Sequence, residues 1–194
     1  MFMVNMKKFL HTQKSLTNLS LILQFNSEEW IRFILNEMPY LRDLKMVLLD
    51  FGCSMFEITP NKSIKRLDIE SSPDTTIRLL KSMPNLESLT LAAPYFLLCN
   101  NEISLDIMEA VKHLTKLKKI EFAYWGKYTV AICLPSVEEV SFFVDGFDLP
   151  NKLDFLKQFL DLNRQIQSVR LYLAFIHQFD FSQYENIKVV KYYD

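Results

Sequence analysis

A six-residue pattern that recurs along the chain constrains its fold more than any other feature of the sequence. Its first, fourth and sixth residues are apolar, and the residues between them are polar. The copies are LTNLSL from Leu16, LRDLKM from Leu41, IKRLDI from Ile64, LESLTL from Leu86, LKKIEF from Leu117, VEEVSF from Val137 and IQSVRL from Ile166. A further, less regular copy is IKVVKY from Ile187 or, almost as well, YENIKV from Tyr184. Chance accounts for about two copies in a chain of this length and composition, so the pattern indicates an internal repeat.

Each copy predicts a short strand, and the segments between copies form the return legs. The apolar–polar–apolar alternation is typical of a strand with one buried face and one exposed face. Helical periodicity predicts helices over residues 27–35, 74–82, 105–114 and 152–160. The segments before Ile64, Val137 and Ile187 lack this periodicity and are expected to be extended or irregular. Pro39 and Pro84 are expected to stop the preceding helices just before the next strand.

The pattern predicts an α/β fold in which residues 1–194 form one solenoid of about eight irregular repeats. One strand and its return leg cannot bury an apolar face alone, whereas stacked copies share a core. The strands then pair in parallel on a concave face, with helices and irregular segments on the convex face. The fifth pattern residues are expected to point outward in a row: Ser20, Lys45, Asp68, Thr90, Glu121, Ser141 and Arg170. A doubly wound sheet, the competing fold, would need strands that are apolar on both faces.

LTNLSL, LRDLKM and LESLTL resemble the L-x-x-L-x-L core of leucine-rich repeats, over essentially the whole chain. That family usually has Asn or Cys three residues after the third apolar position. The corresponding residues here are Gln24, Leu49, Ser72, Pro94, Trp125, Asp145 and Ala174. Long, partly helical units with M-P-x-L segments are similar to the repeat arm of F-box proteins. This resemblance implies substrate recognition in a ubiquitin ligase, with a Skp-type adaptor and a cullin as partners. No segment matches an F-box itself, so we expect a fragment lacking an N-terminal domain, a divergent relative or a free-standing repeat protein.

The composition restricts the class of partner and the compartment. Apolar residues make up 49% of the 194 residues, which excludes intrinsic disorder. Lys and Arg number 22 and Asp and Glu 23, so the net charge is −1. A nucleic-acid-binding domain usually has a basic excess, which makes a ribonucleoprotein role the weaker alternative. The cysteines have no C-x-x-C spacing, as expected of reduced thiols in a cytoplasmic or nuclear protein. Cys133, in the run VAICL, is expected in the core, and no segment is apolar enough to cross a membrane.

No constellation of residues predicts catalysis, a cofactor or a metal site, so the chain is not expected to be an enzyme. His11, His113 and His177 fall in different units without metal-ligand spacing. Lys112 and Lys116 are four residues apart on a predicted helix, near Lys118 and Lys119, where they would form a small positive patch. The hypothesis for this patch is a solvated surface.

The candidate partner-binding residues are aromatic side chains that the repeat register turns outward. One position past the third apolar residue lie Ile22, Val47, Glu70, Ala92, Ala123, Phe143, Tyr172 and Tyr193. The last three, with Arg170, have the composition of an interface hot spot, although they could equally pack beneath a rim loop. Inserts from Ala93 and from Val144 follow strand ends, which predicts a rim patch of Phe96, Trp125 and Phe147. The function predicted is a non-catalytic module that presents a concave sheet and a loop rim to a protein or peptide.

Overall fold

The computed structural model describes residues 8–13, 15–23, 27–49, 58–92, 102–123, 127–128, 130–144, 149–173, 179–184 and 187–192. Its centre is one open sheet of eight parallel strands, in the order in which they occur along the chain. These strands are β1 (Asn18–Leu23), β2 (Asp43–Leu48), β3 (Arg66–Glu70), β4 (Ser88–Ala92), β6 (Lys119–Ala123), β8 (Glu139–Val144), β9 (Ser168–Leu173) and β10 (Lys188–Tyr192). Two short strands, β5 (Glu102–Ile103) and β7 (Lys127–Tyr128), pair separately. The α/β class and the parallel pairing are therefore confirmed.

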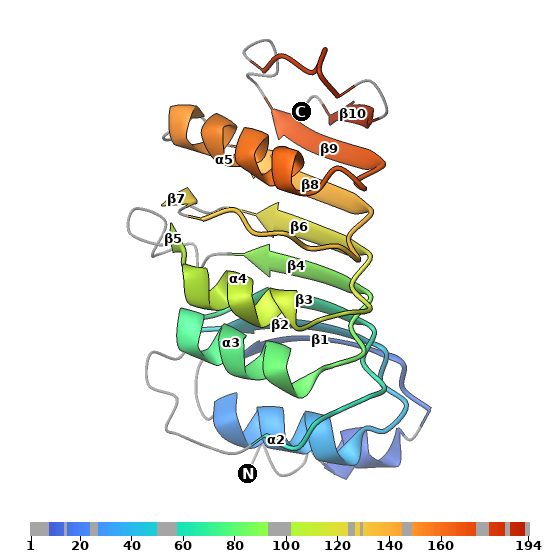
Figure 1. Ribbon diagram of the computed structural model, residues 1–194. Coiled ribbons are helices and arrows are strands. Elements are labelled where there is room, and N and C mark those ends of the chain that lie inside the picture. The colour runs from blue at the N-terminus through green and yellow to red at the C-terminus, as the bar shows by residue number, and fades with distance from the viewer. Residues whose placement is uncertain are drawn as a thin grey trace.

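The helices α2 (Ser27–Glu37), α3 (Pro73–Ser82), α4 (Leu105–Lys112) and α5 (Leu149–Leu162) lie on the same face of the sheet (Figure 1). The predicted helices are confirmed, but α4 ends at Lys112 and α5 extends further at both ends. Pro39 and Pro84 lie in the turns that follow α2 and α3, as expected. The described parts of the irregular return legs, residues 58–63, 130–136 and 179–184, contain no helix. This arrangement is compatible with a solenoid.

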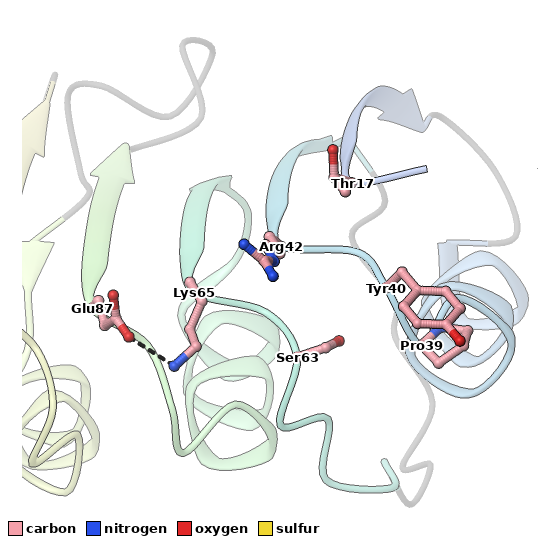
Figure 2. Close-up of a pocket in the computed structure, with 7 residues that line it drawn as sticks. All are labelled: Thr17, Pro39, Tyr40, Arg42, Ser63, Lys65 and Glu87. Carbon is pink, nitrogen blue, oxygen red and sulfur yellow. Dashed lines mark hydrogen bonds and ion pairs between the residues drawn. The ribbon is translucent and has the colours of Figure 1, made fainter. Parts of the chain in front are cut away.

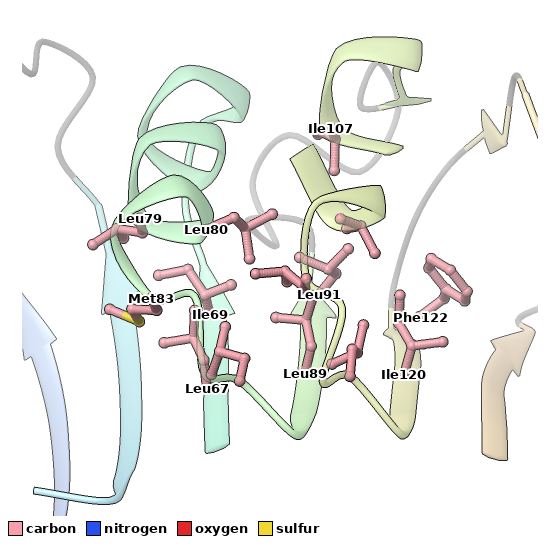
Figure 3. Close-up of a cluster of buried hydrophobic side chains, with 14 of the residues drawn as sticks. Leu67, Ile69, Leu79, Leu80, Met83, Leu89, Leu91, Ile107, Ile120 and Phe122 are labelled. Atoms are coloured by element: carbon pink, nitrogen blue, oxygen red, sulfur yellow. The ribbon is translucent and has the colours of Figure 1, made fainter. Parts of the chain in front are cut away.

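The core lies between the sheet and the helices, and the apolar pattern residues fill it. Figure 3 shows Leu67 and Leu89 of neighbouring strands below Leu79 and Leu80 of α3, with Ile120 of the next strand further along, and each is at most 2% exposed. Further along the sheet, the rings of Phe122 and Phe142 stack with their centroids 5.1 Å apart. Phe155 and Phe159 of α5 pack edge-on against them at 5.8–6.0 Å. Burial of one such side chain contributes about 1.5–3 kcal/mol.

A tight turn introduces most of the strands. The N–H of the first pattern residue donates to the carbonyl three residues earlier, as in Leu86 to Met83 and Val137 to Leu134. Met38, Met83, Leu114 and Leu134 occupy this earlier position and are buried. Asn163 and Asn61 occupy it elsewhere. Thus Met38, Met83, Leu114 and Leu134 are core residues that the six-residue pattern does not include, whereas Gln13 at the same position before β1 is exposed.

Two buried asparagines bind main-chain groups of adjoining return legs. Asn163 is 0% exposed, and its Oδ1 accepts from the Leu134 N–H at 2.5 Å. Its Nδ2 donates to the carbonyls of Ile132 and Phe159, at 2.9 and 2.7 Å. The Nδ2 of Asn61 donates to the Leu35 carbonyl at 2.8 Å, at the end of α2. These side chains satisfy polar main-chain groups that burial removes from water.

Register across the sheet follows the predicted pattern except at its last strand. The fifth pattern residues pair strand by strand in one row, from Ser20 to Arg170. In β10, however, Tyr192 pairs with Tyr172, so the prediction that Tyr193 continues the second outward row is wrong. Tyr184 is 4% exposed, and Ile187 and Val189 pack against the core. Tyr184, Ile187 and Val189 are the first, fourth and sixth residues of YENIKV, so the buried residues match this copy of the pattern rather than IKVVKY.

Two side-chain placements predicted from local sequence are also wrong. Cys133 is exposed, because burial alternates along this segment: Ile132 and Leu134 are buried, and Cys133 between them is not. Lys116 lies in a turn beyond the end of α4, where its Nζ donates to Asn85 Oδ1 at 2.7 Å. Lys112 pairs with Glu109, and Lys118 pairs with Glu138. Lys112, Lys116 and Lys118 are exposed, as the hypothesis of a solvated surface expects, and each contacts an oxygen atom of a neighbouring side chain.

Candidate partner-binding surface

The sheet face opposite the helices is the candidate surface, and no helix or strand among the described residues covers it, which is unusual for parallel strands. Parallel sheets are almost always covered on both faces, and their strands are then apolar throughout. Here the described helices lie together on one side (Figure 1). The other side carries polar residues such as Lys45, Asp68 and Thr90, which are exposed or half-buried. This open face presents fixed polar side chains in register along the sheet.

Cross-strand ion pairs organise the first half of the open face. Arg66 Nε and Nη2 donate to Asp43 Oδ1 and Oδ2 at 2.6 and 2.5 Å, between paired positions of β3 and β2. Lys45 Nζ lies 2.7 Å from Asp68 Oδ2 on the same two strands. The bond from Arg66 holds the pKa of Asp43 below its usual value, and Asp68 raises the pKa of Lys45. Charges of both signs therefore alternate across strands.

A shallow hollow of about 460 Å³ lies over these ion pairs. Its lining residues are Asn18, Leu19, Ser20, Asp43, Leu44, Lys45, Arg66, Leu67, Asp68, Ser88 and Thr90. The hollow thus spans β1 to β4 and combines hydroxyl, amide, carboxylate and cationic groups. Such a mixture suits hydrogen bonding to a polypeptide better than electrostatic attraction of a polyanion.

The second half of the open face contains Arg170, the one predicted site residue whose side chain the structure describes. Arg170 is half-buried, and its Nη2 lies 3.5 Å from Glu139 Oε2. Ser141, its register neighbour on β8, is 1% exposed, which corrects the expectation that it points into solvent. Its backbone pairs with Glu121 on one adjoining strand and with Arg170 on the other, and both residues have longer side chains. Among the described residues, neither Ser141 Oγ nor Arg170 Nε has a hydrogen-bond partner.

The other predicted site residues are described in part or not at all. Phe143 and Tyr172 are paired positions on β8 and β9, so the backbone brings them together as the register predicted, although their side chains are outside the described set. Tyr172 follows Arg170 by two residues along β9. The three residues of the predicted rim patch, Phe96, Trp125 and Phe147, lie outside the described residues. Tyr193 lies outside them as well. In the second outward row, Ile22 is 70% exposed and Ala123 only 6%.

A second hollow, of about 490 Å³, opens at the edge where β1 to β4 begin (Figure 2). It is lined by Thr17, Pro39, Tyr40, Arg42, Ser63, Lys65 and Glu87. We call it the edge pocket. The edge pocket was not predicted from the sequence. The sequence does show that four of its lining residues share one position, the second, in the six-residue pattern: Thr17, Arg42, Lys65 and Glu87. Tyr40 belongs to the M-P-Y-L segment that precedes Leu41.

No family model, curated protein or solved structure matches this chain. Within the described ranges, no group of three or more His, Cys, Asp or Glu side chains is arranged to hold a metal ion. Likewise, no helix among the described residues is long and apolar enough to cross a membrane. What the described surface offers is a sheet face and an edge pocket lined by hydrogen-bonding, charged and aromatic groups.

Proposed function

We propose that this chain is a leucine-rich-repeat solenoid that serves as a non-catalytic protein-interaction module. The open face of the parallel sheet is its recognition surface. The observation that carries the proposal is that face itself: a parallel sheet with its described helices on one side and ordered polar side chains on the other. Solenoids use such extended sheet surfaces to bind other polypeptides.

The strand order and the turns support the solenoid. Each strand of the large sheet pairs with the strands of the preceding and following units. The turn hydrogen bond recurs at Leu41, Leu86, Leu117, Val137 and Ile166. Stacked supersecondary units that contact only their neighbours have this geometry.

The charge pattern favours a protein partner over a nucleic acid. Asp43 pairs with Arg66 and Lys45 with Asp68, so cations of the open face are matched by carboxylates. A surface that binds phosphates carries unmatched Lys and Arg side chains, and its affinity grows with their number. Arg170, with Phe143 and Tyr172 beside it, belongs to the proposed surface because Arg and aromatic residues are enriched at interface hot spots.

Site-specific crosslinking tests the proposal. The photoreactive residue benzoylphenylalanine is placed either at Thr90, on the open face, or at the exposed Lys81 of α3, on the helix side. After irradiation in cells that express the protein, we expect a defined protein adduct from position 90 and none of the same mass from position 81. An adduct containing a Skp-type adaptor and a cullin would assign the module to a ubiquitin ligase. Equal adducts from both positions, or crosslinks only to RNA, would contradict the proposal.

A further inference from the structure

The edge pocket is built by main-chain hydrogen bonds that align the second pattern residues of successive strands. The Thr17 carbonyl accepts from the N–H groups of Arg42 and Asp43, at 2.8 and 2.9 Å. In the same way, the Arg42 carbonyl accepts from Lys65 N–H at 2.8 Å, and the Lys65 carbonyl from Glu87 N–H at 2.8 Å. Neighbouring strands are about 4.8 Å apart. Side chains from separate repeats therefore line one edge at close, regular spacing.

Of the two cations in the edge pocket, one is already matched by a carboxylate. Lys65 Nζ lies 2.7 Å from Glu87 Oε1 (Figure 2), and this bond lowers the pKa of Glu87 from its ordinary value. The exposed guanidinium of Arg42 has no hydrogen bond or ion pair within the described part of the chain. It interacts electrostatically with Asp43, which Arg66 already binds in bidentate fashion. The edge pocket therefore has an excess of one positive charge, centred on Arg42.

An aromatic wall stands across the edge pocket from this charge. Tyr40 is 63% exposed, and Figure 2 shows its ring beside Pro39, with Ser63 between them and the side chains of Arg42 and Lys65. The hydroxyls of Thr17 and Ser63 donate to asparagine oxygens, which leaves Arg42 as the main available donor of the lining. Tyr and Arg, together with Trp, are enriched among the residues that dominate binding energy at protein interfaces. The edge pocket thus combines an anion site with an apolar contact.

We propose that the edge pocket binds an acidic peptide segment of a protein partner. A carboxylate of that segment pairs with Arg42, and a neighbouring apolar side chain packs on Tyr40 and Pro39. Charge complementarity selects this occupant, because guanidinium binds carboxylate in a bidentate geometry. The Glu87 carboxylate at the rim disfavours a polyphosphate chain, whose charges extend beyond one cation. This inference rests on the proposed interaction function and adds the chemistry of the bound segment.

Selection from a random peptide library displayed on phage, with the full chain as bait, provides the probe. We expect selected peptides to share an Asp or Glu next to an apolar or aromatic residue. Their affinity, measured with synthetic peptides by fluorescence anisotropy, should fall about tenfold or more in Arg42→Glu and several-fold in Tyr40→Ala. Lys81→Glu, which reverses an exposed charge on α3, should bind as the wild type does. Circular dichroism melting should show that all variants are folded.

The outcomes separate this inference from the proposed function. Peptides without acidic residues, or binding unchanged in Arg42→Glu, would overturn the edge pocket as an acidic-peptide site, as would failure to select any peptide. Competition by single-stranded polyuridine at equal or lower concentration would assign the edge pocket to nucleic acid instead. A crosslink from position 90 combined with unchanged peptide binding in Arg42→Glu would leave the interaction module standing without this site. The absence of a crosslink from position 90 together with unchanged peptide binding in Arg42→Glu would overturn both the interaction module and the edge pocket as its peptide site.

Discussion

Adjacent residues of one strand have opposite environments, and this alternation is the most direct expression of the repeat. Leu89 is 0% exposed in the shared core, whereas Thr90, the next residue of β4, is half-buried on the open face. We expect Leu89→Asp to lower the free energy of unfolding by several kcal/mol, because it buries an unpaired charge. Thr90→Asp should cost about 0.5 kcal/mol or less. Urea denaturation of both variants measures the difference, and equal losses would contradict the register.

Ser141 offers a second test at the scale of one residue. Its Oγ is buried, and no described residue forms a hydrogen bond with it, so burial removes the hydroxyl from water without replacing its hydrogen bonds. Ser141→Ala is therefore expected to raise the free energy of unfolding by about 1 kcal/mol. Ser82→Ala is the matched control: Ser82 is 3% exposed, but its Oγ donates to the Leu79 carbonyl at 2.8 Å. This control should lose about 1 kcal/mol, and a loss of the same size in Ser141→Ala would contradict the account.

The environments of single residues were predictable where the repeat sets them and not where neighbours do. The row from Ser20 to Arg170 follows from alternation alone, because successive residues of a strand point to opposite faces. Ser141 is buried although its row is otherwise outward-facing, with Glu121 and Arg170 at the paired positions, and the pattern does not encode the size of such neighbours. The prediction that Cys133 is buried was wrong for a different reason. Its run VAICL is apolar throughout, but the segment buries only alternate residues, Ile132 and Leu134.

At the scale of elements, helices were predictable because each carries its own apolar stripe. The asparagines that join the return legs were not predicted, because leucine-rich repeats place their hydrogen-bonding Asn or Cys after each strand. The structure instead buries Asn61 and Asn163 three residues before the first pattern residue. In both cases a helical leg adjoins an irregular one: α2 beside segment 58–61, and α5 beside segment 130–134. An irregular leg leaves main-chain groups that helix bonds do not satisfy, and the amide side chain binds them.

Asn163 should accordingly be one of the most sensitive polar positions in the chain. Asn163→Ala leaves the Leu134 N–H and the Ile132 and Phe159 carbonyls without this partner. We expect a loss of about 3 kcal/mol, since each orphaned buried group costs about 1 kcal/mol or more. Asn36→Ala, on the exposed face of α2, should be neutral or slightly stabilising because alanine favours the helix. Equal effects of the two substitutions in urea denaturation would show that the amide does not join the legs.

The last strand shows the limit of prediction for an element. From the local sequence alone, the apolar residues at 187, 189, 190 and 192 fit the pattern almost equally well as IKVVKY from Ile187 and as YENIKV from Tyr184. Pairing with β9 and burial of Tyr184 decide between them, and both are contacts between segments distant along the chain. The Tyr184 hydroxyl donates to Asp161 Oδ1 at 3.1 Å, and Arg164 lies 5.3 Å from its ring centroid. These contacts with α5 and the turn after it fix Tyr184 in the core.

At the scale of the whole molecule, the order of the strands could be predicted from the recurring six-residue pattern, whereas the two surface hollows could not. A chain of similar units that each need a neighbour stacks in sequence order, which is the order observed. The edge pocket draws Thr17, Arg42, Lys65 and Glu87 from four separate units, and its character depends on which charges meet across strands. A periodic pattern predicts that such residues align. It does not rank one alignment above another as a site.

The cross-strand ion pairs give the molecule a defined response to acid. The pKa of Asp43 is lowered chiefly by its hydrogen bonds from Arg66, and the pKa of Glu87 by Lys65. A carboxyl whose folded pKa is depressed binds fewer protons than in the unfolded chain. Its contribution is therefore complete above the ordinary values of 3.8 and 4.5, and is lost as the pH falls through the lower, folded values. We expect the free energy of unfolding to decline as the pH falls from 5 towards 3.

The variant Asp43→Asn isolates one of these contributions. It keeps an acceptor for Arg66 but cannot titrate, so its stability should be lower than that of the wild type at pH 7 and should converge with it near pH 3. Asp154→Asn, which removes an exposed carboxylate of α5, should run parallel to the wild type at all pH values. Urea unfolding curves at pH 7, 5, 4 and 3 measure both differences. Because exposed pairs are screened by salt, 1 M NaCl should reduce the gap between Asp43→Asn and wild type at pH 7. A gap that is independent of pH and salt would mean that the Asp43–Arg66 contact acts through packing rather than charge.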